Sequence, residues 1–534
     1  MPGYLGAGAS GDDGRRRGKR VARAALGLAL AVGAGNVEGQ KAQAAAEIPG
    51  SHTSTLIGSH GYGKPNQSRV WFNSVVGRWD ALVPRNDGGS SASDHYIVLD
   101  LTGAPAFTGV ELEDRNGGRP DVFWDDLGHR LYVLGSHTST PLFWRVLYNP
   151  ATDNYSVDPL ADGIVVPGVA HATDNWPSTI HVSPNGHVWA AALRDGALAV
   201  QHSADGGTSW MSAAAVLDAD VRGGVTCWSH FALAGTINVG LFAGENGDPA
   251  AETEFMYWYI DQNADPSNPV HWTDESVAIP AAVAGEDSDD HVRAARDEDG
   301  NQYFVTKTEN GAPTAPRIQL LKRTPYGVWW RYGITAAEDR PRQTRPSLVV
   351  DDRNDRLYVF TTDEGGGAGV RVRVPLDRLD LLAMAPQVVL FDQPATMFND
   401  LIAPRDHVEQ ASGVVVLAHD ASRETIWVAT ETIVDRGPGD PLAAPDTGVV
   451  VIGGTLDVAA PGVLANDIDL QGDPISASLV GRPAHGVLTL NPDGSYSYVH
   501  DGSATVADVF HYEVVDDGGA TSDVVAVNLV VNPL

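Results

Sequence analysis

Cysteine is almost absent from this sequence, because Cys227 is the only one among 534 residues. An intrachain disulfide is therefore excluded. Stability must come from buried apolar surface, which a chain of this length supplies in about two to four domains. Thr226 and Trp228 flank the cysteine in a strand-like run. We interpret Cys227 as a buried core thiol rather than a nucleophile.

Positive charge is also scarce. The 36 Lys and Arg residues stand against 68 Asp and Glu residues, and the formal net charge is -32. Residues 1–46 contain seven of the basic residues, so the remainder of the chain is even more acidic. Such a surface repels nucleic acid and anionic membranes, and we predict neither as a partner. It attracts divalent cations, although a solvated surface that serves only solubility has the same composition.

Long apolar runs are also missing. After the N-terminal segment, no run reaches the ~18 apolar residues of a membrane span. The N-terminal segment has basic residues at 15–20, an apolar stretch at 21–32 and small residues at 42–46. This order is typical of a signal peptide cleaved near Ala44 or Ala46, and a disordered tail is the alternative. We predict a secreted protein, extracellular or associated with the cell surface, whose residues 1–46 are a signal peptide or disordered.

Common catalytic motifs are absent as well. The sequence has neither G-x-S-x-G nor H-E-x-x-H. Residues 58–64 read G-x-x-x-x-G-K, but Pro65 replaces the Ser or Thr of a phosphate-binding loop. Helical periodicity of useful length is also missing, which favours an all-β fold.

The chain has instead a repeat of roughly 50 residues between about residues 66 and 434. Each unit contains short apolar strands separated by turns such as Asp297 to Gly300. Seven inner strands start near Arg69, Asp121, Pro177, Val225, His291, Pro346 and Leu401. The repeat predicts a seven-bladed β-propeller over residues 47–434, closed by pairing the segment near Thr53 to Ile57 with the last blade. Two stacked β-sandwiches are the alternative.

One turn carries a family resemblance. Ser203, Asp205, Gly207 and Trp210 match the Asp box, S-x-D-x-G-x-x-W, at its four defining positions. The segment resembles the turns of sialidase-like propellers, in which this motif is structural. Asp289-Asp290-His291, Lys307 and Thr344-Arg345-Pro346 also resemble a group of uncharacterised secreted bacterial propellers. These resemblances imply the fold and export but no chemistry.

A second module follows a linker at residues 435–441, where Gly and Pro interrupt all periodicity. Residues 442–534 alternate apolar and polar side chains, with a hairpin turn at residues 491–494, and predict a small β-sandwich. Residues 460–467, 472–474, 483–486 and 491–495 resemble the bacterial cadherin-like, immunoglobulin-like repeat of adhesins.

Loops that precede inner strands converge on a propeller axis, so we expect any ligand there. The candidate ligand-binding residues are Asp121, Trp176, Asp290, His291, Lys307 and Arg345. Aromatic rings such as Trp176 stack on sugars, and we predict a glycan or cell-surface polysaccharide as partner. A polysaccharide lyase is an alternative, because a cation and a proton acceptor suit that reaction. A sialidase-like hydrolase, for which we find no Tyr–Glu pair, and a scaffold without ligand are further alternatives. Whether the protein is an enzyme stays open.

Calcium is the one cofactor that we expect. Asn466, Asp467, Asp469 and Asp473 lie within eight residues, and clustered carboxylates repel each other unless a cation binds. The cadherin-like resemblance implies a metal at this loop, with Asp446 and Asp516 as further ligands. A solvated acidic turn is the alternative.

Overall fold

The protein is described by a computed structural model, in which strands dominate. The described residues are 43–47, 67–86, 94–101, 106–113, 119–136, 141–170, 178–194, 196–219, 221, 224–245, 255–279, 287–309, 316–336, 343–352, 355–363, 368–376, 379, 382–383, 388–392, 398–405, 413–420, 425–431, 441–469, 473–517, 521–522 and 524–533. Their helical elements are the short 3-10 helices η1 (Pro269–His271), η2 (Ser276–Ala278) and η4 (Gly462–Asn466). No helix in these ranges has the length and apolar character needed to cross a membrane.

Three antiparallel sheets come first along the chain. Sheet 1 contains β2 (Val70–Asn73), β3 (Arg78–Asn86), β4 (Asp94–Asp100) and β5 (Ala106–Glu113). Sheet 2 contains β6 (Arg119–Asp125), β7 (Arg130–Ser136), β8 (Leu142–Asn149), β9 (Asn154–Val157) and β10 (Ile164–Val165), with β9 and β10 both paired to β8. Sheet 3 contains β11 (Thr179–Val182), β12 (Val188–Arg194), β13 (Ala197–Ser203) and β14 (Ala215–Asp218).

Four more sheets have the same order. Sheet 4 contains β15 (Gly224–Leu233), β16 (Thr236–Glu245), β17 (Phe255–Asp261) and β18 (Thr273–Asp274). Sheet 5 contains β19 (Asp287–Arg296), β20 (Gln302–Glu309), β21 (Pro316–Arg323) and β22 (Trp329–Ala336). Sheet 6 contains β23 (Gln343–Asp351), β24 (Arg356–Asp363), β25 (Ala368–Pro375) and β26 (Val388–Asp392). Sheet 7 contains β27 (Phe398–Ile402), β28 (Val414–Asp420), β29 (Thr425–Glu431) and β1 (Gln43–Glu47).

The strands of these sheets are apolar on both faces, which explains their unbroken apolar runs. In β24, Leu357 and Val359 pack against sheet 5, while Tyr358 and Phe360 pack toward sheets 7 and 1. Successive side chains of a strand point to opposite faces, so each sheet needs a neighbour on both sides. The predicted all-β class is confirmed.

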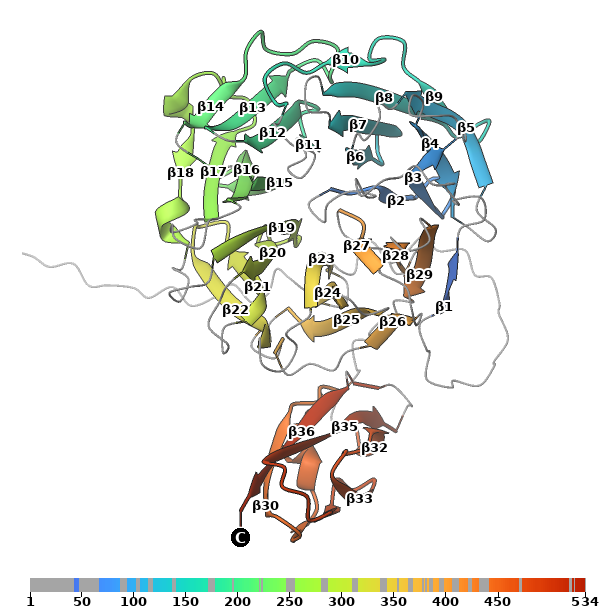
Figure 1. The fold of residues 1–534 in the computed structure, drawn as a ribbon, viewed down its shortest axis with the longest axis vertical. Helices are drawn as coiled ribbons and strands as arrows, with labels where there is room; N and C mark the ends of the chain where they lie inside the picture. The colour runs from blue at the N-terminus through green and yellow to red at the C-terminus, as the bar shows by residue number, and fades with distance from the viewer. Residues whose placement is uncertain are drawn as a thin grey trace, which may run out of the picture. The chain divides into compact units, whose positions relative to one another are not determined.

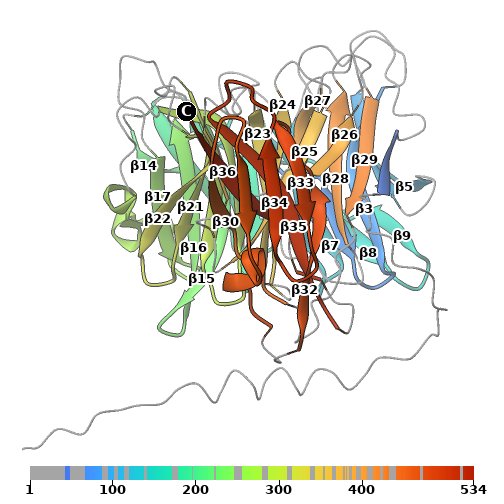
Figure 2. The same ribbon diagram turned by 90° about the horizontal axis from the view of Figure 1, so that it is seen from below.

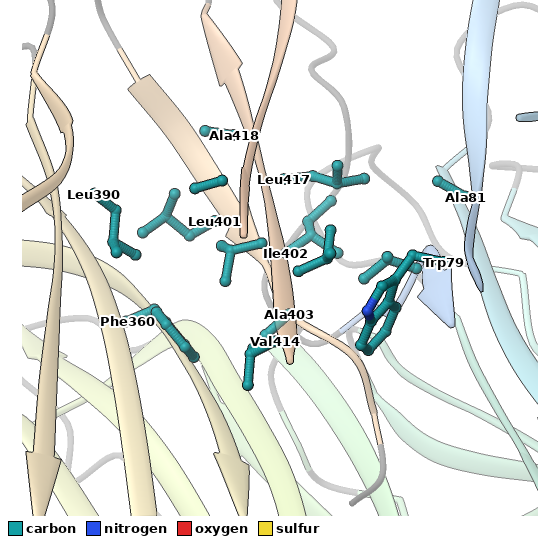
Figure 3. Packing of buried hydrophobic residues seen from close by; sticks show 14 of the residues in the cluster. Trp79, Ala81, Phe360, Leu390, Leu401, Ile402, Ala403, Val414, Leu417 and Ala418 are labelled. Carbon is teal, nitrogen blue, oxygen red and sulfur yellow. The ribbon is translucent and has the colours of Figure 1, made fainter. Parts of the chain in front are cut away.

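Packing runs from each sheet to the next and from sheet 7 back to sheet 1. Separate apolar clusters join sheets 1 and 2, 2 and 3, 3 and 4, 4 and 5, and 5 and 6. A further cluster joins sheets 6, 7 and 1, and it brings Phe360, Leu401 and Trp79 together (Figure 3). Figure 1 shows the first strand of every sheet nearest a common centre, and Figure 2 shows the strands side on.

The last sheet takes its outermost strand from near the N-terminus. β1 pairs antiparallel with β29, with Ala46 opposite Val428 and Glu47 opposite Trp427. The predicted partner near Thr53 to Ile57 lies outside the described residues. The predicted boundary at residue 46 and the predicted cleavage sites after Ala44 and Ala46 lie within β1. The chain itself separates into two units after Lys41.

The C-terminal module has two sheets over one core. One sheet has the order β30 (Asp446–Val451), β36 (Val525–Asn532), β35 (Ala507–Asp516) and β32 (Ile475–Gly481), with β30 parallel to β36. The other has the order β31 (Thr455–Val458), β34 (Tyr496–His500) and β33 (Gly486–Leu490). Tyr498, Phe510 and Tyr512 are fully buried between them. Inward-facing residues alternate with outward-facing ones along β35, as the sequence pattern predicts.

Deleting β1 tests its contribution to the last sheet. A chain that starts at residue 48 should unfold several degrees below a chain that starts at residue 42, since each lost backbone hydrogen bond contributes about 0.5–1.5 kcal/mol. The freed edge of β29 should also promote association. Thermal unfolding by near-ultraviolet circular dichroism measures the difference. Identical transitions in the two chains would contradict a structural role for β1.

Candidate functional site

The inner strands of sheets 5, 6 and 7 share an irregularity near their first residues. In β19, Ser288 pairs with Thr308 and Val292 pairs with Thr306, so three residues of β19 lie opposite Lys307 alone. Register shifts at the corresponding places occur in β23, between Thr344 and Ser347, and in β27. Bulges of this kind re-aim side chains and often adjoin binding sites.

The bulge in β19 places His291 beside the strand position of Lys307. His291 is 4% exposed and Lys307 is 5% exposed. A lysine is rarely buried to this extent without a partner for its charge. Lys307 follows Tyr303 and Val305 at alternate positions of β20, and those two side chains pack against sheet 6. Lys307 therefore faces the seam between sheets 5 and 6.

Sheet 6 presents polar groups to the same seam. Thr361 follows Leu357 and Val359 at alternate positions of β24, and both of these pack against sheet 5. The Thr361 side chain is buried, and its hydroxyl has no hydrogen-bond partner within the described ranges. The bulge in β23 sets Arg345 opposite Thr361, and Arg345 has a φ of 52°. Positive φ in a residue with a Cβ costs about 1–2 kcal/mol, and such strain is concentrated at functional sites.

We call His291, Lys307, Arg345 and Thr361 the polar seam. Three of its members were predicted from the sequence, and Thr361 was missed because threonine in a strand carries no signal of its own. The predicted Asp290 lies in the β19 bulge, but its side chain is outside the described part of the structure. Trp176 also lies outside the described residues.

Asp121 takes part in a different structure from the polar seam. It is fully buried, and its Oδ1 accepts a hydrogen bond from the Ser68 amide at 2.7 Å. Its Oδ2 accepts from the Ile180 amide at 2.8 Å and pairs with Arg405. Asp121 thus joins the starts of sheets 1, 2 and 3 to the segment after β27. All these bonds lie within the chain, so the geometry gives Asp121 a structural place.

The turn after β13 contains the four Asp-box residues. Asp205 Oδ1 accepts from the Ser203 hydroxyl at 2.7 Å and from the Ser209 amide at 2.8 Å, and these bonds hold the pKa of Asp205 well below its usual range, although burial opposes the shift. Gly207 has a φ of 93°, and a Cβ there would lie 2.0 Å from Phe143 of sheet 2. The Trp210 ring meets Phe143 edge-on. The turn therefore fixes sheet 3 against sheet 2, which is a packing function.

A buried network between sheets 1 and 2 was missed in the sequence. The Tyr155 hydroxyl donates to Asp80 Oδ2 at 2.5 Å and accepts from Trp71 Nε1 and the Asn73 amide, each at 3.2 Å. Arg78 Nε donates to Asp80 Oδ1 at 2.8 Å. Burial raises the pKa of Asp80 to about 6 against the opposing effects of these bonds. In the sequence, the Arg-x-Asp spacing of Arg78 and Asp80 on one strand could have indicated this network.

This Tyr–Asp pair bears on the sialidase alternative, which requires an activated tyrosine. Burial raises the pKa of Tyr155, and the neighbouring Asp80 carboxylate raises it further. Tyr155 is also 2% exposed. A tyrosine held protonated and away from solvent is unsuited to attack a substrate, so the pair is an inter-sheet contact.

The six predicted calcium ligands form two groups in the C-terminal module. In the first, the Tyr512 hydroxyl lies 2.9 Å from Asp446 Oδ2 and 3.0 Å from Asp467 Oδ2. Two backbone carbonyl oxygens, of Ala444 and Val463, also lie within 3.2 Å of this hydroxyl. Burial raises the pKa of Asp446 and of Asp467 to about 6 each. Asn466 contacts the carbonyl oxygen of Pro445 at 3.1 Å beside them.

The second group contains Asp469, Asp473 and Asp516. The Asp473 amide donates to Asp469 Oδ1 at 3.1 Å. Burial raises the pKa of Asp473, and the nearby Asp517, Asp469 and Asp516 raise it further. The printed contacts thus place the six expected ligands in two groups. No set of three or more His, Cys, Asp or Glu side chains arranged for a metal occurs in the ranges that the structure covers.

The comparisons with known proteins first define the C-terminal module. Residues 439–533 match the family described as Bacterial cadherin-like domain. This match confirms the predicted resemblance for that part of the chain. No curated protein matches the sequence.

Solved structures resemble the larger part of the chain. The polysaccharide lyase Uly1 is 11% identical, with 74% of this chain and 100% of that chain covered and a TM-score of 0.42. The WD40 domain of coronin from Toxoplasma gondii is 10% identical, with coverage of 75% and 87% and a TM-score of 0.41. A mutant of NanB sialidase from Streptococcus pneumoniae is 12% identical, with coverage of 70% and 69% and a TM-score of 0.34. These likenesses select no activity.

Replacing Tyr155 by Phe tests the network between sheets 1 and 2. We expect Tyr155→Phe to destabilise the protein by about 1–3 kcal/mol, because Asp80 Oδ2 stays buried without the Tyr155 hydroxyl. The matched control is Tyr148→Phe in the same aromatic cluster, whose hydroxyl donates to Asp153, a side chain that is 53% exposed. Denaturant unfolding should give a loss below about 1 kcal/mol for the control. Equal losses in the two variants would refute the assigned burial of the Asp80 contact.

Proposed function

We propose that this protein is an extracellular glycan-binding protein whose ligand contains acidic sugars and docks at the polar seam. The observation that carries the proposal is the bulge in β19, which sets His291 beside Lys307 at the start of an inner strand. Nearby Arg345 adds a second permanent positive charge. Arginine and lysine at such a place suit the carboxylate or sulfate groups of acidic polysaccharides.

The negative charge of the whole protein does not oppose this proposal. At physiological ionic strength the charges on the rest of the surface are screened beyond about 8 Å. A carboxylate that reaches the polar seam interacts mainly with the cations there. The overall charge then slows the approach of an acidic polymer more than it weakens the bound state.

We further propose that the seven sheets are the blades of a seven-bladed β-propeller, with β1 as the last outer strand. Support comes from the apolar packing between sheets 7 and 1, which completes the series of seams. In this architecture the loops before inner strands share one end of the molecule. The polar seam then lies at that end, where a polymer can reach it.

A polysaccharide lyase is the second candidate function that the polar seam favours. Lysine and arginine would neutralise a uronate carboxylate, and His291 would accept the proton from the adjacent carbon. The elimination leaves an unsaturated sugar at the new chain end. A scaffold without ligand predicts neither binding nor product.

A binding experiment separates these three functions. We expect the protein to bind at least one of alginate, polygalacturonate, hyaluronan or heparin, and not dextran. The variant H291A/R345A should lose about tenfold or more in affinity, the equivalent of 1.4 kcal/mol, with an unchanged melting temperature. Lys322→Gln, at the other end of sheet 5, is the matched control for lost charge.

The outcomes of this experiment divide the candidates. New unsaturated chain ends during incubation would favour the lyase over the binder. Absence of binding to every polysaccharide would favour the scaffold. An unfolded double variant would show that the seam residues are structural, and the proposal would then be wrong.

We also propose that the cadherin-like module binds calcium at the Asp446 and Asp467 group. Four oxygen atoms surround the Tyr512 hydroxyl, which can donate only one hydrogen bond. The group therefore has more oxygen atoms that could bind a cation than hydrogen-bond donors. Two half-buried carboxylates there are also close enough that Asp446 raises the pKa of Asp467. Calcium prefers six to eight oxygen ligands, including carboxylates and backbone carbonyls.

Calcium should therefore raise the stability of this module in the full chain. An excess of about a hundredfold over the dissociation constant contributes about 2.7 kcal/mol if only the folded state binds. Calorimetry with calcium or with chelator should shift the transition of the module, and Asp467→Asn should remove the shift. Asp457→Asn, on β31, is the control and should retain it. Superimposable curves for the unaltered protein would rule out the metal.

Export is the remaining proposal. It rests on the basic and apolar order of residues 15–32 and on the small residues at 42–46. Because β1 begins at Gln43, a mature chain that keeps the whole strand must start at or before that residue.

A further inference from the structure

Polar side chains from four sheets lie in the later parts of inner strands or just after them. His181 lies two residues before the turn that follows β11, and His230 lies three residues before the end of β15. Arg296 is the last residue of β19. Arg405 follows β27, and its guanidinium donates to the carbonyl oxygen of Ile180, next to His181. We call these four residues the axial cluster.

The two histidines of the axial cluster form a pair. His181 Nε2 lies 3.2 Å from His230 Nδ1. His181 is 2% exposed, and its Nδ1, on the other side of the ring, has no hydrogen-bond partner among the residues that the structure describes. Burial lowers the pKa of His181, and His230, Arg405 and Arg296 lower it further. His181 is therefore neutral, and both arginines are close enough to lower its pKa.

The arginines leave further donors unused. Arg405 directs its two Nη groups to Ile180 and Asp121, but its buried Nε has no partner in the described ranges. The Nε of Arg296 is also buried and, within the same ranges, has no hydrogen-bond partner. A buried donor without a partner costs about 1–3 kcal/mol, and more when it is charged. Two such donors and the unpartnered ring nitrogen of His181 therefore call for partners at the axial cluster.

The charge at the axial cluster points to the kind of acceptor. Arg296 and Arg405 each bring a positive charge to it. Among the side chains placed here by these contacts, the only carboxylate described is that of Asp121, which Arg405 neutralises. An excess of positive charge thus lies inside a protein whose net charge is -32. A neutral water satisfies the geometry but leaves this charge unbalanced.

We propose that the axial cluster is a binding site for a small oxyanion, held by Arg296 Nε, Arg405 Nε and His181 Nδ1. The ligand class is a sulfate, phosphate or carboxylate group, whose oxygens accept several charge-assisted hydrogen bonds at once. An anion at Nδ1 selects the tautomer with the proton on that nitrogen, and His181 Nε2 then accepts from His230. Arg296, His230 and Arg405 are partly exposed, so the group can enter from solvent.

Titration of the full chain with inorganic sulfate, inorganic phosphate and acetate tests the proposal. Calorimetry is done at constant ionic strength against chloride. We expect saturable binding of at least one of the three, weakened about tenfold or more in Arg296→Gln. Because Arg296 Nε has no hydrogen-bond partner within the described residues, this variant should fold. Arg130→Gln, which removes an exposed arginine from β7, is the matched control and should bind as the unaltered protein does.

The result also identifies the source of the anion. Preference for sulfate or phosphate indicates an inorganic or esterified oxyanion, and preference for acetate indicates a carboxylate. His181→Phe keeps the ring packing against Phe123 and removes the donor, so it should weaken binding without an effect on binding at the polar seam. No saturable binding, or equal weakening in Arg130→Gln, would overturn the proposal and leave water at the axial cluster. Failure of glycan binding at the polar seam has no bearing on this result.

Discussion

Each central strand in this protein carries apolar side chains on both of its faces, and neither face can be left to water. The seam between sheets 6, 7 and 1 shows what this demands: Phe360, Leu401 and Trp79 come from three sheets and from positions over 300 residues apart. Burying a side chain of this size contributes roughly 1.5–3 kcal/mol. A single sheet therefore has little stability alone, and the series of seams stabilises all of them together. β1 has a related role. Without it, β29 would be an unpaired edge strand of the last sheet.

Polar groups inside such an assembly are stabilised where they have partners. Asp121 is an example, since three donors, from Ser68, Ile180 and Arg405, converge on its one carboxylate. Asp80 with Tyr155 and Arg78 does the same between sheets 1 and 2. In the polar seam and the axial cluster, Thr361 and His181 each leave a buried polar atom without a described partner, and Asn73 and Arg78 beside Asp80 do the same.

Local sequence patterns predicted the parts of this structure that depend on neighbours along the chain. The Asp-box turn follows from Ser203, Asp205 and Gly207 alone, because its hydrogen bonds close within seven residues. The alternation in β35 predicted which side chains enter the sandwich core. Long-range partners were not predictable: nothing around Arg405 indicates that it meets Asp121, 284 residues away. The bulge in β19 was also invisible, although the side chains that it displaces, His291 and Lys307, were selected for their chemistry.

The distribution of charge gives the sites their character. Acidic residues dominate the composition, yet buried or partly buried cations lie in the polar seam and in the axial cluster. Inside the protein the lower dielectric strengthens their action on a bound anion, while salt weakens the repulsion from the distant surface. The cadherin-like module has the reverse arrangement, because its half-buried carboxylates, Asp446 and Asp467, lack a described cation beside them and suit a divalent metal. One chain thus presents two kinds of electrostatic site, and each is defined by the burial of its charges rather than by the net charge of the protein.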